Sequence, residues 1–298
     1  MQIYVTKSEK SESAIDIHNV YDFNLQHIFE CGQCFRWNPY KDGYIGVVKD
    51  IAAFVTYNEN SGIMTIECEN AENTSDFWIN YFDLKRDYAE IKKKLAKIDK
   101  YLCKSVEFGY GIRLLKQDPF ETLISFILSA NNNIPRIKGC VEKISGTYGK
   151  ETKYGLYTFP TPKMLSVATA QDISDCCHAG YRCEYIEKTV KKFIESPIDV
   201  TDLNNMSLQD AEKFLRQYDG VGPKVADCIL LFTGAHTDAF PVDVWVKRVI
   251  EELYIGKTST LKEIDNFAVE HFGELAGFAQ QYLFYFAREH LDAMKNII

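Results

Sequence analysis

The stretch Gln217-Tyr-Asp-Gly-Val-Gly-Pro-Lys-Val-Ala-Asp-Cys228 determines how this chain of 298 residues is organised. The segment before it, Ser207–Tyr218, carries apolar residues at helical spacing behind a serine that suits an N-cap. Gly220 and Gly222 then break the helix, and Pro223 suits the first turn of a second helix, where its missing N–H costs nothing. Two glycines one residue apart leave backbone amides open to an anion, and the second helix turns its positive end toward the same place. The stretch therefore predicts a helix, a Gly-x-Gly hairpin and a helix that together bind a phosphate.

Lys224 lies at the start of the second predicted helix, where the helix dipole disfavours a further positive charge. A lysine that is also shielded from water there suits the role of an amine nucleophile. Cys228 follows four residues later and shares its helix face. Downstream, Pro241-Val-Asp243 precedes another apolar run, which makes Asp243 an N-cap whose amide donors would keep the carboxylate ionised. A nucleophilic lysine and a carboxylate beside a phosphate-binding hairpin indicate chemistry on a nucleic-acid backbone.

The combination of Gly-Val-Gly-Pro-Lys-Val-Ala-Asp-Cys with Pro-Val-Asp resembles the helix-hairpin-helix Gly/Pro-Asp (HhH-GPD) superfamily of DNA glycosylases, and more narrowly its 8-oxoguanine DNA glycosylases. The resemblance implies a bifunctional N-glycosylase and AP lyase that excises 8-oxoguanine from duplex DNA and prefers cytosine opposite. In that scheme Lys224 attacks C1′ of the sugar, and Asp243 stabilises the cationic sugar.

Two alternatives stay open at this point. A Gly-x-Gly hairpin also occurs in DNA-binding modules that have no catalysis. An alkylpurine glycosylase of the same superfamily would use the aspartate with water, although that class lacks the lysine found here as Lys224.

Composition describes an ordinary globular chain, with 46% hydrophobic and 26% charged residues and a length that suggests about two domains. The formal net charge of −8 argues mildly against a nucleic-acid partner, although only the charge at the contact face decides this. No stretch resembles a signal peptide or a membrane span. We therefore expect the protein in the cytoplasm. The resemblance implies a monomer that binds double-stranded DNA and is associated with the nucleoid through it.

Nine cysteines without a regular framework fit a reducing compartment. Cys228 is the last of them, so the iron–sulfur cluster that several relatives bind near their C-terminus is not expected. Cys31-Gly-Gln-Cys34 could form half of a zinc site or a redox pair, but no matching Cys/His pair stands near it. We expect no metal and no cofactor, and leave open a weakly bound cation at the hairpin.

The fold class is predicted as α+β. The segments Tyr44–Tyr57 and Ile63–Cys68 are rich in β-branched and aromatic residues with a turn between them, which predicts an antiparallel meander. Asp87–Leu102 shows the pattern of one helix with its lysines facing outward. We place an N-terminal β domain with flanking helices in residues 1–105, which by resemblance is TATA-binding-protein-like. Residues 106–298 form the larger helical HhH-GPD part, with the DNA-binding and active-site cleft.

The resemblance also implies a pocket for the damaged base. Gly32, in Cys31-Gly-Gln-Cys-Phe-Arg-Trp37, matches the glycine whose carbonyl contacts the base. Gln280 and Phe284 share a helix face, and they match the residues that bind the pairing edge of the base and stack on it. Cys228 forms the opposite wall, and Phe232 shapes the fit. Without the family, Gly32 would be a strand-entry glycine and Phe284 a core residue.

The remaining implied site residues contact DNA. A nearly all-apolar helix is predicted over Pro119–Ala130 and is ended by three asparagines. By resemblance the first asparagine and two arginines reach the cytosine opposite the lesion, a tyrosine enters the duplex, and the hairpin and the start of the helix after Asp243 hold the backbone. These residues are Asn131, Arg136, Arg182, Tyr181, Gly220, Val221, Gly222, Val244 and Trp245.

Two positions depart from the family. Trp245 stands where the eukaryotic 8-oxoguanine enzymes have a histidine, and Ala287 stands where they have the acidic residue that pairs with it. These two departures concern how the phosphate beside the lesion is held.

Overall fold

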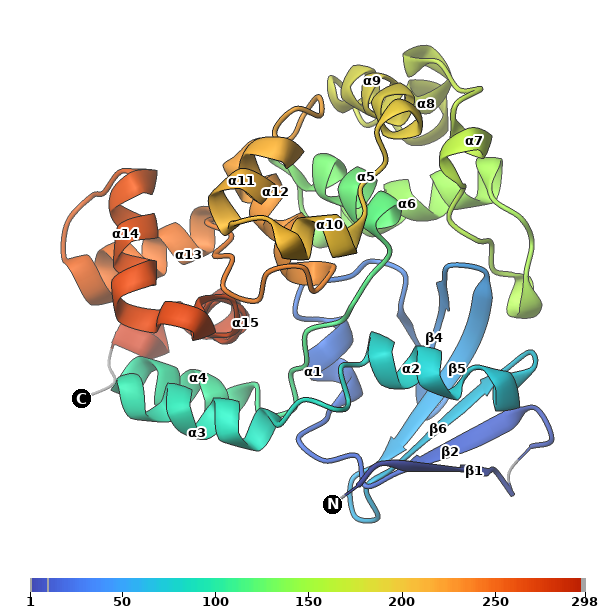
Figure 1. Cartoon of the computed structure of the whole chain (residues 1–298), viewed down its shortest axis with the longest axis horizontal. Helices are drawn as coiled ribbons and strands as arrows, with labels where there is room; N and C mark the ends of the chain where they lie inside the picture. Colours follow the sequence, from blue (N-terminus) through green and yellow to red (C-terminus); the bar gives the residue numbers. More distant parts are fainter. Residues whose placement is uncertain (1, 10, 296–298) are drawn as a thin grey trace.

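The computed structural model describes the backbone of residues 2–9 and 11–295 and side chains up to residue 291. A six-stranded antiparallel sheet lies beside a larger helical part (Figure 1). The strand order is β1-β2-β6-β5-β4-β3. The strands are β1 (Tyr4–Lys7), β2 (Ala14–His18), β3 (Asn38–Tyr40), β4 (Gly43–Val48), β5 (Ile51–Asn58) and β6 (Ile63–Cys68). This confirms the predicted α+β fold.

The segment 44–57 is two strands and not one. β4 and β5 pair through a tight turn in which Val48 lies opposite Ile51. Lys49 adopts φ 56°, the left-handed region that such a turn requires. The apolar run continues on both sides of the turn, which is why the pattern alone did not reveal it.

Apart from α1, which lies between β2 and β3, the helices follow the sheet in the chain and make up most of the rest of the molecule. They are α1 (Leu25–Phe29), α2 (Ser75–Tyr81), α3 (Tyr88–Ile98), α4 (Lys100–Phe108), α5 (Pro119–Ser129), α6 (Ile134–Tyr148), α7 (Pro162–Leu165), α8 (Ala170–Cys177), α9 (Arg182–Glu195), α10 (Val200–Asn205), α11 (Leu208–Leu215), α12 (Pro223–Phe232), α13 (Val244–Val249), α14 (Leu261–Phe272) and α15 (Ala276–Lys295).

The predicted helix over 87–102 is broken at Asp99. This residue has extended backbone (φ −160°, ψ 170°) and caps α4 by accepting from the amide of Leu102. Its carboxylate also accepts from the Tyr254 hydroxyl at 3.1 Å and lies 3.2 Å from His271 Nε2. Partners about 160 residues away in the chain thus hold the break in place.

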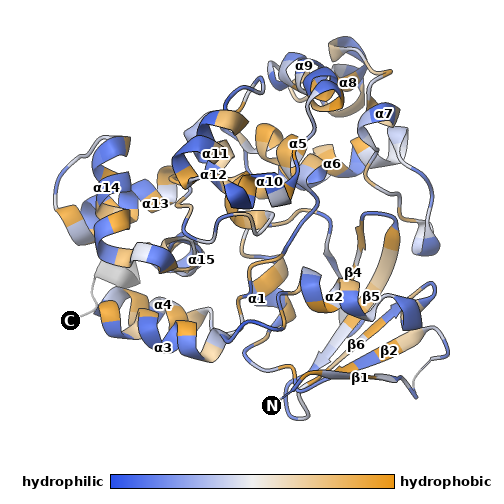
Figure 2. Cartoon of the chain, in the orientation of Figure 1, coloured by the Kyte–Doolittle hydropathy of each residue, from blue (hydrophilic) through white to orange (hydrophobic). Residues whose placement is uncertain are grey.

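α5 is the central helix, as the apolar pattern predicted. Eight of its residues are buried, and Asp118 caps it by accepting from the amides of Phe120 and Glu121. Figure 2 shows α5 largely in the apolar colour, whereas α3 alternates between polar and apolar turns. The helix ends at Ser129, and Asn131 then takes φ 49°. α5 is therefore positioned by packing on several sides, which fixes the groups at its C-terminal end.

Buried apolar residues form two clusters, one under the sheet and a larger one among the helices. Trp37, Trp78 and Met64 belong to the sheet cluster. Leu95 of α3 and Leu102 of α4 belong to the helical cluster, although both lie before residue 105. The division of the chain near residue 105 stays a prediction.

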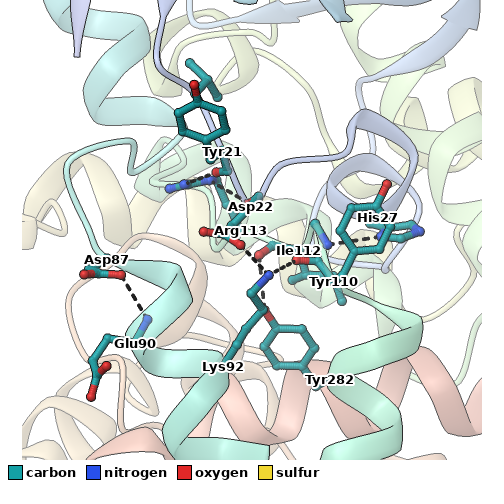
Figure 3. Close-up of polar contacts among 12 residues, drawn as sticks. Tyr21, Asp22, His27, Asp87, Glu90, Lys92, Tyr110, Ile112, Arg113 and Tyr282 are labelled. Atoms are coloured by element: carbon teal, nitrogen blue, oxygen red, sulfur yellow. Dashed lines mark hydrogen bonds and ion pairs between the residues drawn. The ribbon is translucent and has the colours of Figure 1, made fainter. Parts of the chain in front are cut away.

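A polar network joins the two parts (Figure 3). The buried Arg113 donates to the carbonyls of Tyr21, Asp22 and Asp83, and its guanidinium lies 4.4 Å from the centre of the Tyr88 ring. Lys92 Nζ donates to the Asp22 carboxylate at 2.6 Å and to the Tyr110 carbonyl at 2.8 Å. These bonds fix the segment 20–30, which leads into the loop that carries Gly32.

Glu121, in the first turn of α5, should make stability depend on pH. Burial raises the pKa of Glu121 to about 7, against the opposing effect of Arg36. The folded state therefore binds more protons than the unfolded state between about pH 4.5 and pH 7, so stability from this group is lost as pH rises through that window. Glu121→Gln should raise stability at pH 8 by about 2 kcal/mol and Tm by about 4 °C, but should change little at pH 4.5.

Melting curves recorded by circular dichroism at several pH values measure this difference. Glu107→Gln, which removes an exposed carboxylate on α4 paired with Lys104, is the control for the loss of a surface carboxylate. A gain for Glu121→Gln that is the same at every pH would contradict the prediction.

Candidate active site

The predicted hairpin is present between α11 and α12. Ser207 caps α11, and Gly222 is the N-cap residue of α12. Gly220 has φ +80°, and a side chain there would meet the Tyr185 ring at 2.9 Å, so this position requires glycine. A Cβ at Gly222 would meet nothing within 4 Å. The Thr189 hydroxyl donates to the Asp219 carbonyl at 2.8 Å, which ties the hairpin to α9.

Lys224 lies in the first turn of α12, and its amine points to α5. Nζ donates to the Ser129 hydroxyl oxygen at 2.9 Å and lies 5.0 Å from the centre of the Phe126 ring. Asp243 caps α13 as predicted, accepting from the amides of Trp245 at 3.0 Å and Val246 at 2.8 Å. Lys224 and Asp243, the nucleophile and the carboxylate predicted from the sequence, line the same pocket.

Burial acts on the Asp243 carboxylate in the direction opposite to the predicted effect of the amide donors. Burial raises the pKa of Asp243 above its usual value, and this outweighs the two amide donors and Lys224, which act in the opposite direction. The amide bonds were predicted correctly, but the sequence did not show how little water reaches the carboxylate.

One pocket collects most of the predicted catalytic and base-binding residues. It encloses about 300 Å³ of empty space, counted together with the solvent at its mouth. Its lining consists of Gly32, Phe126, Lys224, Cys228, Phe232, Pro241, Asp243, Gln280, Gln281 and Phe284. Residues separated by up to 252 positions in the chain are brought together here. Burial raises the pKa of the Cys228 thiol to about 12, with Lys224 opposing, so this wall of the pocket is a neutral thiol.

The Gly32 loop is held against α15. Gly32 has φ +82°, and a side chain there would lie 3.0 Å from Phe284 Cε1, so glycine allows the ring to come close. Gln281 Nε2 donates to the Cys31 carbonyl at 2.7 Å. Gln33 bonds the extended segment 113–117 through Arg113 and Leu115. The position of the Gly32 backbone is thus set by bonds on both sides.

Gln280 carries an unsatisfied acceptor. Its side chain is 4% exposed, and Oε1 has no hydrogen-bond partner among the residues that the structure describes. A buried polar atom without a partner costs about 1–3 kcal/mol, so such atoms call for an explanation. Because Gln280 lines the pocket, a ligand with N–H donors would satisfy this atom.

A larger groove runs from the pocket along the hairpin. It encloses about 1440 Å³ of empty space, open solvent included. Its lining includes the hairpin residues Gly220 and Gly222, the catalytic candidates Lys224 and Asp243, and Asn131 at the far end. Val244 also lines it and is 78% exposed. The amide of Val221 donates to the Tyr218 carbonyl within the hairpin at 3.2 Å.

Residues predicted to meet the opposite strand surround the end of α5. Asn131 and Arg136 are exposed, and Arg136 donates to the His178 carbonyl at 3.1 Å. Tyr181 is 55% exposed, packs edge-on against Tyr185, and lies next to the hairpin through that ring.

Arg182 is placed differently from the expected contact with a base. It is 6% exposed, and its guanidinium donates to the carbonyls of Ala130, Asn131 and Ala179. It thereby holds the turn at Asn131, so its donors are already used by the protein main chain.

Trp245 and Ala287 line one cavity of about 760 Å³, solvent included, together with other residues of α13 and α15. Arg248, Arg288 and His290 line it as well. The bulky tryptophan and the small alanine thus face the same space, where the resembled family has a charged pair.

Cys31 and Cys34 are buried free thiols, and Cys31 donates to the Ile28 carbonyl at 3.2 Å. Burial raises the pKa of Cys31 to about 11, which disfavours the thiolate that metal binding or redox chemistry needs. Within residues 2–9 and 11–291, no three His, Cys, Asp or Glu side chains lie close enough together to hold a metal ion. The expectation that no cofactor is needed stays a prediction.

Several residues of the site were not predicted from sequence. Ser129 and Phe126 contact Lys224 from α5, and Gln281 fixes the Gly32 loop. The signal for Ser129 was a hydroxyl in a largely apolar helix, since a polar group there needs a partner, but Thr122 and Ser125 of the same helix give the same signal. Gln281 had no comparable local signal.

Comparison with known proteins agrees with this geometry. Residues 16–123 match the family described as 8-oxoguanine DNA glycosylase, N-terminal domain, and residues 124–273 match the HhH-GPD superfamily base excision DNA repair protein. A probable N-glycosylase/DNA lyase of Methanothermobacter thermautotrophicus is 30% identical over 93% of this chain and 98% of its own. The N-glycosylase/DNA lyase of Saccharomyces cerevisiae is 30% identical over 79% of this chain and 69% of its own.

A solved structure is also similar. The Clostridium acetobutylicum 8-oxoguanine glycosylase/lyase, in complex with double-stranded DNA containing cytosine opposite 8-oxoG, superposes with a TM-score of 0.89. It is 42% identical and covers 98% of this chain and 99% of its own. None of the described helices has the length and apolar character needed to cross a lipid bilayer. The chain belongs to the 8-oxoguanine DNA glycosylases of the HhH-GPD superfamily of base excision DNA repair proteins, a family of N-glycosylase/DNA lyase enzymes.

Proposed function

We propose that this protein excises 8-oxoguanine from duplex DNA and then cleaves the strand at the resulting abasic site. The observation that carries the proposal is the single pocket in which Lys224 and Asp243 lie beside Cys228, Phe284 and the unpaired Gln280. A nucleophile, a carboxylate and an unsatisfied hydrogen-bond acceptor at one site suit attack on a sugar while its base is held.

The chemistry follows from these groups. The C1′–N9 bond breaks with its electron pair on the base, which takes up a proton, and the lone pair of Lys224 Nζ forms a bond to C1′. Loss of a proton from nitrogen and opening of the sugar ring give a Schiff base. Removal of a C2′ proton then expels the 3′ phosphate and cleaves the strand. Asp243 stabilises the positive charge that develops on the sugar.

The pocket suits an oxidised purine. The pairing edge of 8-oxoguanine presents N–H donors, which would satisfy Gln280 Oε1. The lesion also carries an N–H at N7, where guanine has only a lone pair, and the carbonyl of Gly32 is our assigned acceptor for it. Phe284 and Cys228 provide the two faces of the slot, and Phe232 closes its end.

The duplex would lie along the groove. Main-chain amides of Gly220 and Gly222 bind phosphate and supply affinity without reading sequence. Val244 and Trp245, at the start of α13, lie along the lesion strand. Tyr181 enters the base stack while the lesion nucleotide rotates out, because it is an exposed aromatic residue beside the hairpin. We assign the protein as a monomer on double-stranded DNA.

Trapping with borohydride tests the proposal. The purified protein should excise 8-oxoguanine and form a covalent adduct with lesion DNA, because reduction fixes a lysine Schiff base. An alkylpurine glycosylase would excise a different base and give no adduct, and a binding module would do neither. Absence of both excision and adduct would overturn the proposal.

Cytosine opposite the lesion should be preferred. Asn131 is exposed at the end of the groove, and Arg136 presents donors that suit the acceptors of cytosine. Arg182 contributes by holding the Asn131 turn. The Clostridium complex with this base pair supports the assignment. A lost charged hydrogen bond costs roughly 1–3 kcal/mol, so 8-oxoguanine opposite adenine should be excised about ten- to a hundredfold more slowly.

Single-turnover excision on four duplexes that differ only in the opposite base measures the preference. Arg136→Ala should narrow the gap between cytosine and adenine. The control is Arg216→Ala, a change at an exposed arginine paired with Glu212. It should change the excision rates on all four duplexes by the same factor. Equal rates for the unmodified protein on all four duplexes would refute the role of these residues and leave the glycosylase assignment intact.

A further inference from the structure

We propose that Ser129 is a positioning residue for the nucleophile, which holds the amine of Lys224 in the direction needed for attack. The inference rests on the proposed function, because it concerns the same reaction. Ser129 is the last residue of α5, and Lys224 opens α12, so the pair joins two helices that pack against each other.

The hydrogen bonds of the Ser129 hydroxyl show which partner donates in its contact with Lys224. Its hydroxyl donates to the Phe126 carbonyl at 2.7 Å, and a serine hydroxyl has one hydrogen. Only lone pairs therefore face Lys224, whose Nζ lies 2.9 Å from the Ser129 oxygen. The lysine must be the donor in this bond. Ser129 thus holds one N–H of the amine, and the Cys228 thiol is a second side-chain partner of Lys224. In the neutral amine the nitrogen lone pair is left to the substrate.

The surroundings of the amine strengthen this placement. The Phe126 ring lies 5.0 Å from Nζ and is itself stacked on Phe232, with centres 5.3 Å apart and planes at 22°. Phe126 and Ser129 are three residues apart, so they face α12 from one side of α5. A lysine side chain has several freely rotating bonds. Contact with the Phe126 ring and the Ser129 hydroxyl selects one conformation of the Lys224 side chain among many.

Ser129 does not act as the base. A proton passed to its hydroxyl would have to continue to the Phe126 carbonyl, which cannot carry it further. The carboxylate of Asp243 lines the same pocket as Lys224 and is the available acceptor. Positioning and proton acceptance are thereby divided between α5 and the start of α13.

A pair of substitutions of equal shape isolates the oxygen atom. Threonine keeps a hydroxyl on Cβ, and valine replaces it by a methyl group. Ser129→Val should slow both excision and borohydride trapping about tenfold in single turnover. Ser129→Thr should restore at least half of the loss on a logarithmic scale. DNA affinity should stay within about twofold for both variants, because the hydrogen bond is made inside the protein.

Trapping on DNA that already contains an abasic site separates nucleophile positioning from base recognition, and the same tenfold loss is expected for Ser129→Val. The control is the pair Ser105→Val and Ser105→Thr. Ser105 is a buried serine of α4 that donates to the Tyr101 carbonyl at 2.8 Å, and both changes should leave trapping unchanged. Melting curves identify any variant that fails to fold.

The possible outcomes distinguish a failure of the positioning role from a failure of the proposed function. Equal losses for Ser129→Val and Ser129→Thr would show an effect of shape and overturn the inference, as would full rates for Ser129→Val. If the unmodified protein neither excises 8-oxoguanine nor forms an adduct, the proposed function itself fails. An unmodified protein that traps normally, with a Ser129→Val variant that traps equally fast, defeats only the positioning role.

Discussion

Lys224→Gln is expected to reduce excision by about a thousandfold or more and to abolish borohydride trapping, with lesion DNA still bound. Glutamine keeps much of the length of the side chain and its contact with Ser129 through an amide N–H, but it has no nucleophilic amine. The hairpin and the other residues that line the groove and the base slot are unchanged by the substitution, so binding should persist. Single-turnover excision, gel detection of the reduced adduct and a binding titration are measured on one lesion duplex.

A lysine from the same groove provides the comparison. Lys247 lines the groove and lies 3.7 Å from Glu251, on the helix that Asp243 caps. Lys247→Gln should weaken DNA binding and still give the covalent adduct at saturating DNA. Adduct formation by Lys224→Gln at the normal rate would show that another amine forms the Schiff base and would refute the assignment of the nucleophile.

Asp243→Asn is expected to slow excision by about a hundredfold or more while leaving the protein at least as stable. In the proposed reaction the carboxylate faces a sugar that becomes positively charged, and removing such an electrostatic contact has an effect of about this size. Asparagine is also a good N-cap, so the amides of Trp245 and Val246 keep an acceptor. Burial raises the pKa of Asp243, which means that the charged form is disfavoured in the folded state. Neutral asparagine removes that cost, so Tm should stay equal or rise.

Activity and melting temperature must therefore be measured together at neutral pH. Asp118→Asn is the matched control, because Asp118 caps α5 in the same way but does not line the pocket described above. It should retain excision. If the activity of Asp243→Asn falls only in proportion to its folded fraction, the carboxylate acts as a helix cap and has no role in excision.

Local features were predictable because they depend on neighbours in the chain. Ser207 and Asp243 cap helices where their sequence contexts placed them, and the Gly-x-Gly hairpin between α11 and α12 follows from two glycines and a proline. The spacing of Lys224 and Cys228 put them on one face because the period of the helix is fixed. Helix 119–129 was evident from its apolar pattern, and its observed end lies one residue before the predicted one.

Features that depend on distant partners were not predictable. The apolar pattern continues through Asp99, but the helix breaks there, where Tyr254 and His271 bind the carboxylate. Arg182 was expected at the DNA, yet carbonyls of a turn some fifty residues earlier in the chain hold it inside. In both cases contacts with distant residues determined the structure, and the neighbouring sequence did not show these contacts.

The sequence by itself determined which residue types the proposed chemistry uses: a lysine after a Gly-x-Gly hairpin, an aspartate at a helix start, and the residues of the candidate base pocket. Only the tertiary structure determined the solvent exposure and the hydrogen-bond partners of these groups. The desolvation of Asp243, the unpaired oxygen of Gln280 and the bond from Lys224 to Ser129 arise where α5, α12, α13 and α15 meet. Residue type and helical period are local properties, whereas burial and hydrogen-bond partnership exist only after distant segments have packed together.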